Sequence, residues 1–236
     1  MVSACGQLFF EGSLPLSICL ELEDVTFAYP HKPALLEHVS LGFSGGSYTC
    51  LRGPSGCGKS TLLRLLCRLL EPSRGQIIFK KQPLAAIDPS NLRRQVVYLH
   101  QTPIVLDASV SDNLLLPFGF KINQDLTPPD AKVLSARLEE ILLHGVSLET
   151  PAVKLSVGQK QRLCLLRGML VAPAVLLLDE PTAALDKESA RVVLDVLQRL
   201  NREQETTIIL VAHGDEVLAQ PGVKILEFQG KQVVRT

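Results

Sequence analysis

Gly53-Pro-Ser-Gly-Cys-Gly-Lys59-Ser60-Thr61 is the stretch that decides the fold, because it fits the pattern G-x-x-x-x-G-K-[ST]. It follows an apolar, strand-like run at Tyr48–Leu51 and opens a helical pattern at 59–71. Glycines let successive backbone N–H groups point at one cluster of oxygens, and the helix N-terminus adds partial positive charge. The stretch therefore predicts a phosphate-binding loop. The alternative is a glycine-rich turn that only caps an ordinary helix.

Each residue of this loop is a candidate contact to a bound nucleotide. The candidates are Gly53, Pro54, Ser55, Gly56, Cys57, Gly58, Lys59, Ser60 and Thr61. We expect Lys59 to reach the β- and γ-phosphates of ATP and the Ser60 hydroxyl to ligate Mg²⁺. Cys57 is expected to be present for its small size. The sharper hypothesis is that oxidation of Cys57 blocks nucleotide binding.

A second candidate site element is an apolar strand that ends in two acids, Val175-Leu-Leu-Leu-Asp179-Glu180. A buried strand delivers its last side chains to the sheet edge where ligands bind in doubly wound folds. Asp179 suits the Mg²⁺ shell, and Glu180 is placed to polarise a water for in-line attack on the γ-phosphate. The alternative is a strand end with two solvated acids.

The order of strand-like and helix-like segments predicts an α/β fold. The apolar runs Tyr48–Leu51, Ala174–Leu178 and Thr207–Ala212 suit strands buried on both faces. Helical patterns follow the first two of these runs, at 59–71 and 187–203. We therefore expect a phosphate-loop NTPase core with a mainly parallel sheet, an N-terminal antiparallel β portion and an inserted helical subdomain.

The inserted subdomain is expected at 103–170, where strand signals are scarce, within a single domain of 1–236 whose core is 1–102 and 171–236. Thr127-Pro-Pro-Asp130 predicts a helix start, with Thr127 as the N-cap and a proline at the first helical position. One face of this helix is expected to carry Leu134, Leu138, Ile141 and Leu142.

Composition excludes several classes of protein. The chain has 236 residues, of which 46% are apolar and 20% charged, so it should fold as a globular domain. Lys+Arg and Asp+Glu are balanced at 24 each, which gives no basic footprint for nucleic acid. The sequence shows no membrane span, and its first 24 residues do not resemble a signal peptide. The six cysteines form no C-x-x-C pair, so we expect reduced thiols.

Leu155-Ser-Val-Gly-Gln159-Lys-Gln-Arg162 resembles the signature motif of ABC ATPases, and Ser156 lies 23 residues before Asp179. The resemblance covers residues 18–230 and includes the phosphate loop and the acidic strand in the order typical of the family. Ser156 and Gln159 also fit a plain capping box, S-x-x-Q. The two interpretations are compatible, because a helix start with free N–H groups is itself a phosphate site.

The resemblance implies further contacts to ATP. Tyr29 resembles the aromatic residue that stacks on adenine, although an edge-strand tyrosine with a structural role is the alternative. Gln101 resembles the glutamine that contacts Mg²⁺ and water, and His213 resembles the histidine that contacts the γ-phosphate. With the motifs above, the expected catalytic residues are Glu180, His213, Gln101 and Lys59, and the expected metal ligands are Ser60, Gln101 and Asp179.

The same resemblance implies a head-to-tail homodimer with two composite sites. In the family, the signature of one subunit closes on the nucleotide held by the other. Ser156, Gly158 and Gln159 are therefore expected to contact a partner's ATP, and Asp186 resembles the residue that crosses the dimer seam. Two departures bear on hydrolysis rate and dimer tightness: Val157 replaces the usual glycine of the signature, and Ala183 replaces a frequent serine.

The function implied by the resemblance is ATP hydrolysis that powers a separate integral membrane permease. Its cytoplasmic coupling helix is expected to dock near Gln101 and 102–120, which places the chain peripherally at the cytoplasmic face of the plasma (inner) membrane. The stretch 100–118 is similar to ATPase subunits of small two-component iron or metal export systems.

Three alternatives to metal export remain. The first is the ATPase subunit of a phosphate, amino-acid or lipoprotein-type transporter. The second is a soluble ABC protein of ribosomes or DNA, although such proteins usually carry two cassettes or a long coiled coil. The third is a nucleotide-binding regulatory module without turnover, which only Val157 supports.

Overall fold

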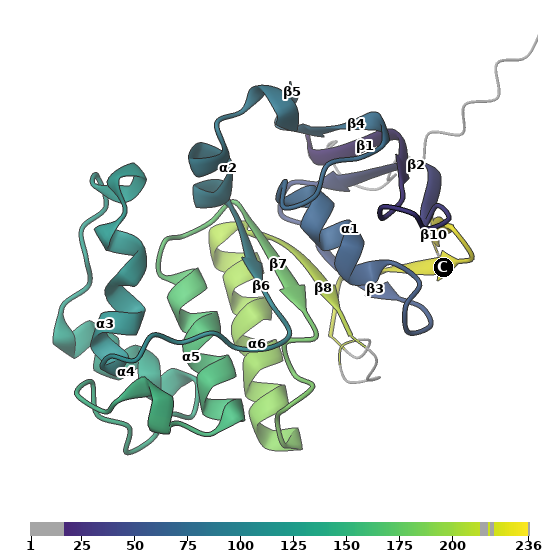
Figure 1. The fold of residues 1–236 in the computed structure, drawn as a ribbon. Coiled ribbons are helices and arrows are strands. Elements are labelled where there is room, and N and C mark those ends of the chain that lie inside the picture. Colours follow the sequence, from purple (N-terminus) through teal and green to yellow (C-terminus); the bar gives the residue numbers. More distant parts are fainter. Residues whose placement is uncertain (1–16, 213–216, 218–219, 236) are drawn as a thin grey trace, which may run out of the picture.

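Two β-sheets organise the part of the chain that the computed structural model describes, residues 17–212, 217 and 220–235 (Figure 1). One sheet is antiparallel, in the order β2-β1-β4-β5. Its strands are β1 (Ile18–Phe27), β2 (Leu36–Ser44), β4 (Arg74–Phe79) and β5 (Gln82–Pro83). The expected N-terminal antiparallel portion is thus confirmed.

The other sheet has the order β10-β9-β3-β8-β7-β6, and all its pairings are parallel except that of β10 with β9. Its strands are β3 (Tyr48–Arg52), β6 (Val96–Leu99), β7 (Val175–Asp179), β8 (Thr207–Val211), β9 (Val223–Gln229) and β10 (Gln232–Arg235). The three apolar runs coincide with β3, β7 and β8 within one residue. Val211 pairs with both Leu51 and Asp179, so the ends of these strands meet at one sheet edge.

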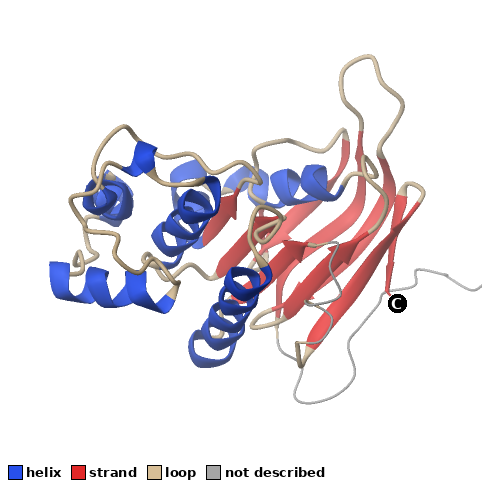
Figure 2. Ribbon diagram, turned by 90° about the horizontal axis from the view of Figure 1, so that it is seen from below, coloured by secondary structure: helices blue, strands red, loops and turns tan. Residues whose placement is uncertain are grey.

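Helices cover both faces of the parallel sheet. The leucines of α1 (Lys59–Leu66) pack in one apolar cluster with the antiparallel sheet and with β7 and β8, so α1 lies between the two sheets. On the other face, α5 (Val157–Met169) and α6 (Lys187–Gln204) pack against β3, β7 and β8. Each fully buried leucine contributes about 1.5–3 kcal/mol relative to an exposed one. In Figure 2 one end of the molecule is helical and the other is mostly strands, with helices also packed alongside the strands between them.

The segment between β6 and β7 is helical, as expected. It holds α3 (Val110–Leu115), α4 (Ala131–Glu140), α5 and short 3₁₀ turns, with a core of its own. The turns are Leu116–Gly119, Lys121–Asn123 and Ala152–Lys154. A further turn, Leu84–Ala86, and α2 (Pro89–Gln95) precede β6. The boundaries 103 and 170 of a separate subdomain stay a prediction.

Three local predictions are wrong. Asp130, not Thr127, is the N-cap of α4, because its carboxylate accepts from the Val133 N–H at 2.8 Å. Leu142 lies beyond the helix with φ 55°, and the buried side chain there is Leu143. The first helix ends at Leu66 instead of residue 71, because Arg68 turns to φ 53° and ends it with a left-handed residue.

The cysteines and the helices of the described residues bear on two further predictions. Cys19, Cys50, Cys57, Cys67 and Cys164 are free thiols, whereas Cys5 lies outside the described residues. Of the helices within 17–212, 217 and 220–235, none is long and apolar enough to cross a bilayer.

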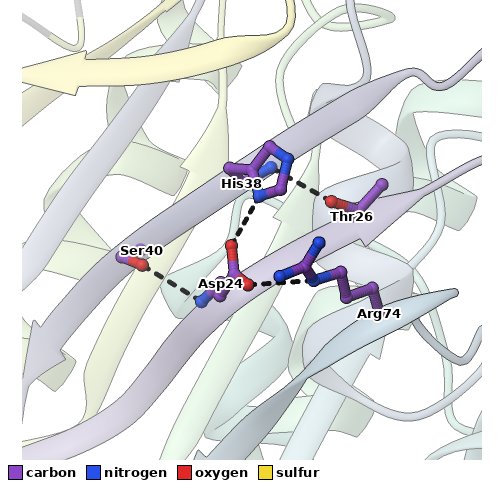
Figure 3. A network of polar contacts seen from close by, with 5 residues as sticks. All are labelled: Asp24, Thr26, His38, Ser40 and Arg74. Carbon is purple, nitrogen blue, oxygen red and sulfur yellow. Dashed lines mark hydrogen bonds and ion pairs between the residues drawn. The ribbon is translucent and has the colours of Figure 1, made fainter.

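The antiparallel sheet has a bulge at Asp24, where the pairing of β1 with both β2 and β4 shifts register. The Asp24 carboxylate contacts the His38 ring at 2.6 Å and the Arg74 guanidinium at 3.1 Å (Figure 3). The hydrogen bond with His38 holds the pKa of Asp24 below its ordinary value. Exposed ion pairs of this kind add little to stability. The tight packing of Gly75 against this bulge is the stronger constraint.

Gly75 has φ +80°, and a Cβ there would lie 2.3 Å from the Glu23 carbonyl oxygen and 2.4 Å from that of Asp24. We predict that Gly75→Ala lowers the free energy of unfolding by about 3 kcal/mol, through left-handed strain and backbone overlap. Urea denaturation measures this value. Gly119→Ala is the matched control, because no atom lies within 4 Å of its added Cβ. Equal stability of both variants would contradict the prediction.

Candidate functional site

The loop between β3 and α1 curls around the ammonium group of Lys59. This side chain is buried, and its Nζ donates to the carbonyl oxygens of Gly53 and Pro54, each at 2.8 Å. Gly58 caps α1 with φ 111°, and Gly53 has φ +146° with Phe228 Cβ 2.8 Å from a built Cβ. Both positions need glycine, because L side chains rarely adopt such backbone angles. The geometry fits the predicted phosphate-binding loop.

A buried carboxylate, Asp179, faces the start of α1. It is 3% exposed at the end of β7, and Ser60 Oγ donates to its Oδ1 at 2.8 Å. Tyr98 Oη, from the end of β6, donates to its Oδ2 at 3.0 Å. Burial raises the pKa of Tyr98 to about 12, so the hydroxyl remains a donor at neutral pH. Tyr98 was absent from the candidates, because only the pairing of β6 with β7 brings it here.

The oxygens of Ser60 and Asp179 fit Mg²⁺, a hard cation that takes carboxylate and hydroxyl ligands and keeps water and phosphate oxygens in its shell. Residues 17–212, 217 and 220–235 hold no group of three or more His, Cys, Asp or Glu side chains that would bind a metal ion by itself. The pair therefore suits a cation that arrives with nucleotide phosphates. Gln101, the third predicted ligand, contacts Glu180.

Glu180 is held by three different segments. Its N–H donates to Val211 O at 3.1 Å, and its φ of 51° is strained for a residue with a side chain. Gln101 Nε2 donates to Glu180 Oε2 at 2.7 Å, and Gln161 Nε2 donates to the Glu180 carbonyl at 3.0 Å. Gln161 was not predicted, although it lies within the signature stretch. Gln101 lies where the helical segment begins, and Gln161 lies in α5 of that segment. Through these two hydrogen bonds Glu180 links the helical segment to the end of β7.

The ring of Tyr29 is half-buried at the end of the antiparallel sheet. It packs edge-on against Phe27 with 4.9 Å between ring centroids, and its hydroxyl lies 3.1 Å from Thr61 Oγ1 in α1. The tyrosine is therefore fixed beside the phosphate-loop helix. Stacking on adenine stays a prediction. His213 lies outside the described residues.

The signature stretch begins α5. Ser156 and Gln159 form the predicted capping box, in which the Ser156 hydroxyl accepts from Gln159 N–H and Gln159 Oε1 accepts from Ser156 N–H. The Cβ position of Gly158 lies 3.3 Å from Ala184 O, so the signature packs on the loop before α6. Val157 is the first residue of α5 and is 58% exposed. Its backbone is helical and its side chain points to solvent.

Asp186 is the N-cap of α6. Its carboxylate accepts from Ser189 N–H at 2.9 Å, and this hydrogen bond holds the pKa of Asp186 below its ordinary value. Asp186 is exposed, and its place at a dimer seam stays a prediction. The structure thus brings together Lys59, Ser60 and Asp179, and separately Gln101 and Glu180, while Ser156 and Gln159 contact each other.

A family model described as ABC transporter matches residues 36–183, which is more than half of the chain. The chain belongs to the ABC transporter family. Its ABC ATPase domain belongs to a family that hydrolyses ATP and couples this hydrolysis to transport.

Relatives of known name differ in length. The chain is 35% identical over 184 residues to the probable iron export ATP-binding protein FetA of Escherichia coli (strain K12). The match covers 78% of this chain and 80% of FetA. It is 37% identical over 232 residues to the ATP-dependent lipid A-core flippase of Xanthomonas euvesicatoria pv. vesicatoria (strain 85-10). That match covers 92% of this chain but only 39% of the flippase.

Solved ABC cassettes share the fold. The dimeric structure of MJ0796, a bacterial ABC transporter cassette, has a TM-score of 0.78 and 26% identity, with 92% of this chain and 97% of that chain covered. A dimeric post-hydrolysis state of the same cassette, bound to ADP and Pi, has a TM-score of 0.77 and 25% identity, with the same coverage.

The ABC domain also carries a groove of about 960 Å³ beside β6. Residues of α2, β6, α5 and the segment 102–124 line it. Ile104 and Phe120 present exposed apolar side chains there, while Arg93, Lys121 and Arg167 add positive charge. This groove lies where the sequence predicts a partner to dock.

Cys57 is the most accessible of the described thiols, because the other four are buried. Its Sγ lies 3.9 Å from Lys59 Nζ, inside the phosphate loop. We predict that ATP at ten times its dissociation constant slows alkylation of Cys57 by roughly tenfold, because bound phosphates cover the loop. Mass spectrometry of the labelled protein in a Cys5→Ser background measures the rate. An unchanged rate would place the nucleotide away from this loop.

Proposed function

We propose that this chain binds MgATP between two copies of itself and hydrolyses it to power a separate membrane permease, in a system that exports iron or another metal. The observation that carries the proposal is the arrangement at the end of β7. There a hydroxyl and carboxylate pair, Ser60 and Asp179, precedes a carboxylate held by Gln101. Such a pair beside a phosphate loop suits a nucleotide with its cation and an attacking water.

Each residue has a stated part in the proposed reaction. Lys59 and the loop N–H groups hold the β- and γ-phosphates, and Ser60 and Asp179 would hold the cation, which neutralises phosphate charge when bound. Glu180 polarises the water that attacks the γ-phosphate in line. Gln101 orients the Glu180 carboxylate through the 2.7 Å hydrogen bond. His213 is proposed to contact the γ-phosphate.

The proposed homodimer is head to tail, with the signature of each copy against the nucleotide of the other. Ser156 and Val157 are exposed at the start of α5, where a helix N-terminus attracts phosphate. The MJ0796 cassette is dimeric in its solved structure. Bound ATP shifts the equilibrium from the open to the closed dimer only if it binds the closed dimer more tightly.

The permease is proposed to dock a cytoplasmic coupling helix in the groove beside β6. Its exposed Ile104 and Phe120 suit an apolar helix face, and Arg93, Lys121 and Arg167 suit carboxylates on that helix. Asn123 Oδ1 is buried without a hydrogen-bond partner among the described residues and lines the same groove. This docking places the chain at the cytoplasmic face of the plasma membrane.

Metal export is the proposed process because FetA, named as a probable iron export protein, matches over 80% of its own length. The flippase shares a similar identity, but this chain corresponds to 39% of it. A match over most of both lengths supports a shared role better than a match to one part. Phosphate, amino-acid and lipoprotein transport, or a soluble role, are outcomes of the capture experiment below.

We predict that Glu180→Gln lowers the rate of ATP hydrolysis by about 10²–10⁴-fold, because the amide cannot accept a proton from water. The variant should still bind ATP and form a stable ATP-dependent dimer. Phosphate release and size-exclusion chromatography measure the two effects. Glu203→Gln, an exposed change at the end of α6, is the control with wild-type turnover. Equal phosphate release by Glu180→Gln and wild type would refute the role of Glu180.

A second prediction concerns the permease. Tagged Glu180→Gln protein with ATP and Mg²⁺ should co-purify a membrane protein with several spans from solubilised host membranes. Adding Phe120→Asp should abolish capture, because it removes an exposed apolar contact and repels the carboxylates proposed on the coupling helix. Val133→Asp is the matched control, since Val133 is an exposed apolar residue on α4 outside the groove.

The captured protein is then reconstituted in vesicles with the wild-type chain and assayed for ATP-driven iron movement. Movement of lipid, phosphate or amino acids instead would overturn metal export. Capture of ribosomes or DNA-repair proteins would overturn transport, while leaving ATP hydrolysis unaffected.

A further inference from the structure

We propose that Tyr98 is a positioning residue for the cation of MgATP, because its hydroxyl fixes the carboxylate of Asp179. This inference rests on the MgATP site of the proposed function. Tyr98 lies near the end of β6, three residues before Gln101, and was not among the site residues expected from the sequence.

The carboxylate of Asp179 is hydrogen-bonded at both of its oxygens. Its two carboxylate oxygens have donors from different elements: Ser60 of α1 on Oδ1 at 2.8 Å, and Tyr98 of β6 on Oδ2 at 3.0 Å. Ser60 is itself an expected ligand of the cation, so its hydroxyl would serve both the cation and Asp179. Tyr98 has no such second task and can hold Oδ2 throughout. The orientation of the carboxylate therefore depends on Tyr98 as well as on Ser60.

The hydroxyl of Tyr98 also lies beside a side chain of α1. The hydroxyls of Tyr98 and Tyr29 lie near the guanidinium of Arg64, on α1, and the interaction with Tyr98 is the main cause that raises the pKa of Arg64. The Tyr98 hydroxyl donates to Asp179 and keeps lone pairs that can accept from a cation such as Arg64. Tyr29 in turn contacts Thr61, next to Ser60. The Tyr98 hydroxyl therefore lies between Asp179 and positively charged Arg64.

Loss of the hydroxyl should therefore affect the cation more than the nucleotide. Groups that orient metal ligands typically change metal affinity by about 10- to 100-fold when they are removed. Lys59 and the loop N–H groups would hold the phosphates, and among the described residues no hydrogen bond joins them to Tyr98. Tyr98→Phe keeps the ring and removes only the donor.

The test uses Mn²⁺ as the probe for the cation and a fluorescent ATP analogue as the probe for the nucleotide. EPR of Mn²⁺ in the presence of a non-hydrolysable ATP analogue gives the metal dissociation constant. Fluorescence titration in EDTA gives nucleotide affinity without metal. For Tyr98→Phe we expect a metal dissociation constant raised by about 10- to 100-fold, with nucleotide affinity in EDTA unchanged.

Tyr48→Phe is the matched control, because the buried Tyr48 hydroxyl has no hydrogen-bond partner among the described residues. It should match wild type in both titrations. If Tyr98→Phe fails to fold, as judged by thermal unfolding, Arg64→Met replaces it and should also weaken Mn²⁺ binding selectively.

Two results would overturn the inference: a Tyr98→Phe protein with the metal affinity of wild type, or an equal loss of nucleotide affinity with and without metal. A wild-type chain that binds nucleotide no better with Mg²⁺ would instead overturn the MgATP site of the proposed function.

Discussion

The buried carboxylate of Asp179 is the constraint on which the site depends. A carboxylate taken out of water without partners costs several kcal/mol, a large part of the 5–15 kcal/mol or so that stabilises a typical domain. Both of its oxygens are hydrogen-bonded, by Ser60 from α1 and Tyr98 from β6. These bonds give the helix and the two strands one relative position that apolar packing alone would not specify. The phosphate loop, which leads into α1, is aligned by the same contacts.

The next residue, Glu180, extends this constraint to the helical segment. Its strained backbone turns the chain away from β7, and Gln101 and Gln161 hydrogen-bond to its side chain and carbonyl. Gln101 lies where the helical segment begins, and Gln161 lies in its last helix. A movement of that segment therefore changes the surroundings of the proposed water-polarising group. The same residue serves chemistry and the joint between two parts of the fold.

Sequence patterns predict the parts of this structure that depend on near neighbours in the chain. The phosphate loop, the buried strands β7 and β8 and the capping box at Ser156 all follow from short spacings. Tyr98 could not be assigned, because its role arises from the pairing of β6 with β7 and from an α1 side chain more than thirty residues away. Thr127 and Leu142 were misjudged because competing caps and a left-handed residue decided where α4 begins and ends.

The capping box of α5 limits how the signature can vary. The Ser156 side chain that is proposed to meet a partner's phosphate also completes the first turn of its own helix. Loss of such a cap costs a helix about 0.5–2 kcal/mol whether or not a partner is present. Selection on this position therefore acts on folding of the single chain as well as on assembly. A serine can persist here even in descendants that have stopped hydrolysing ATP, so its presence alone is a poor record of activity.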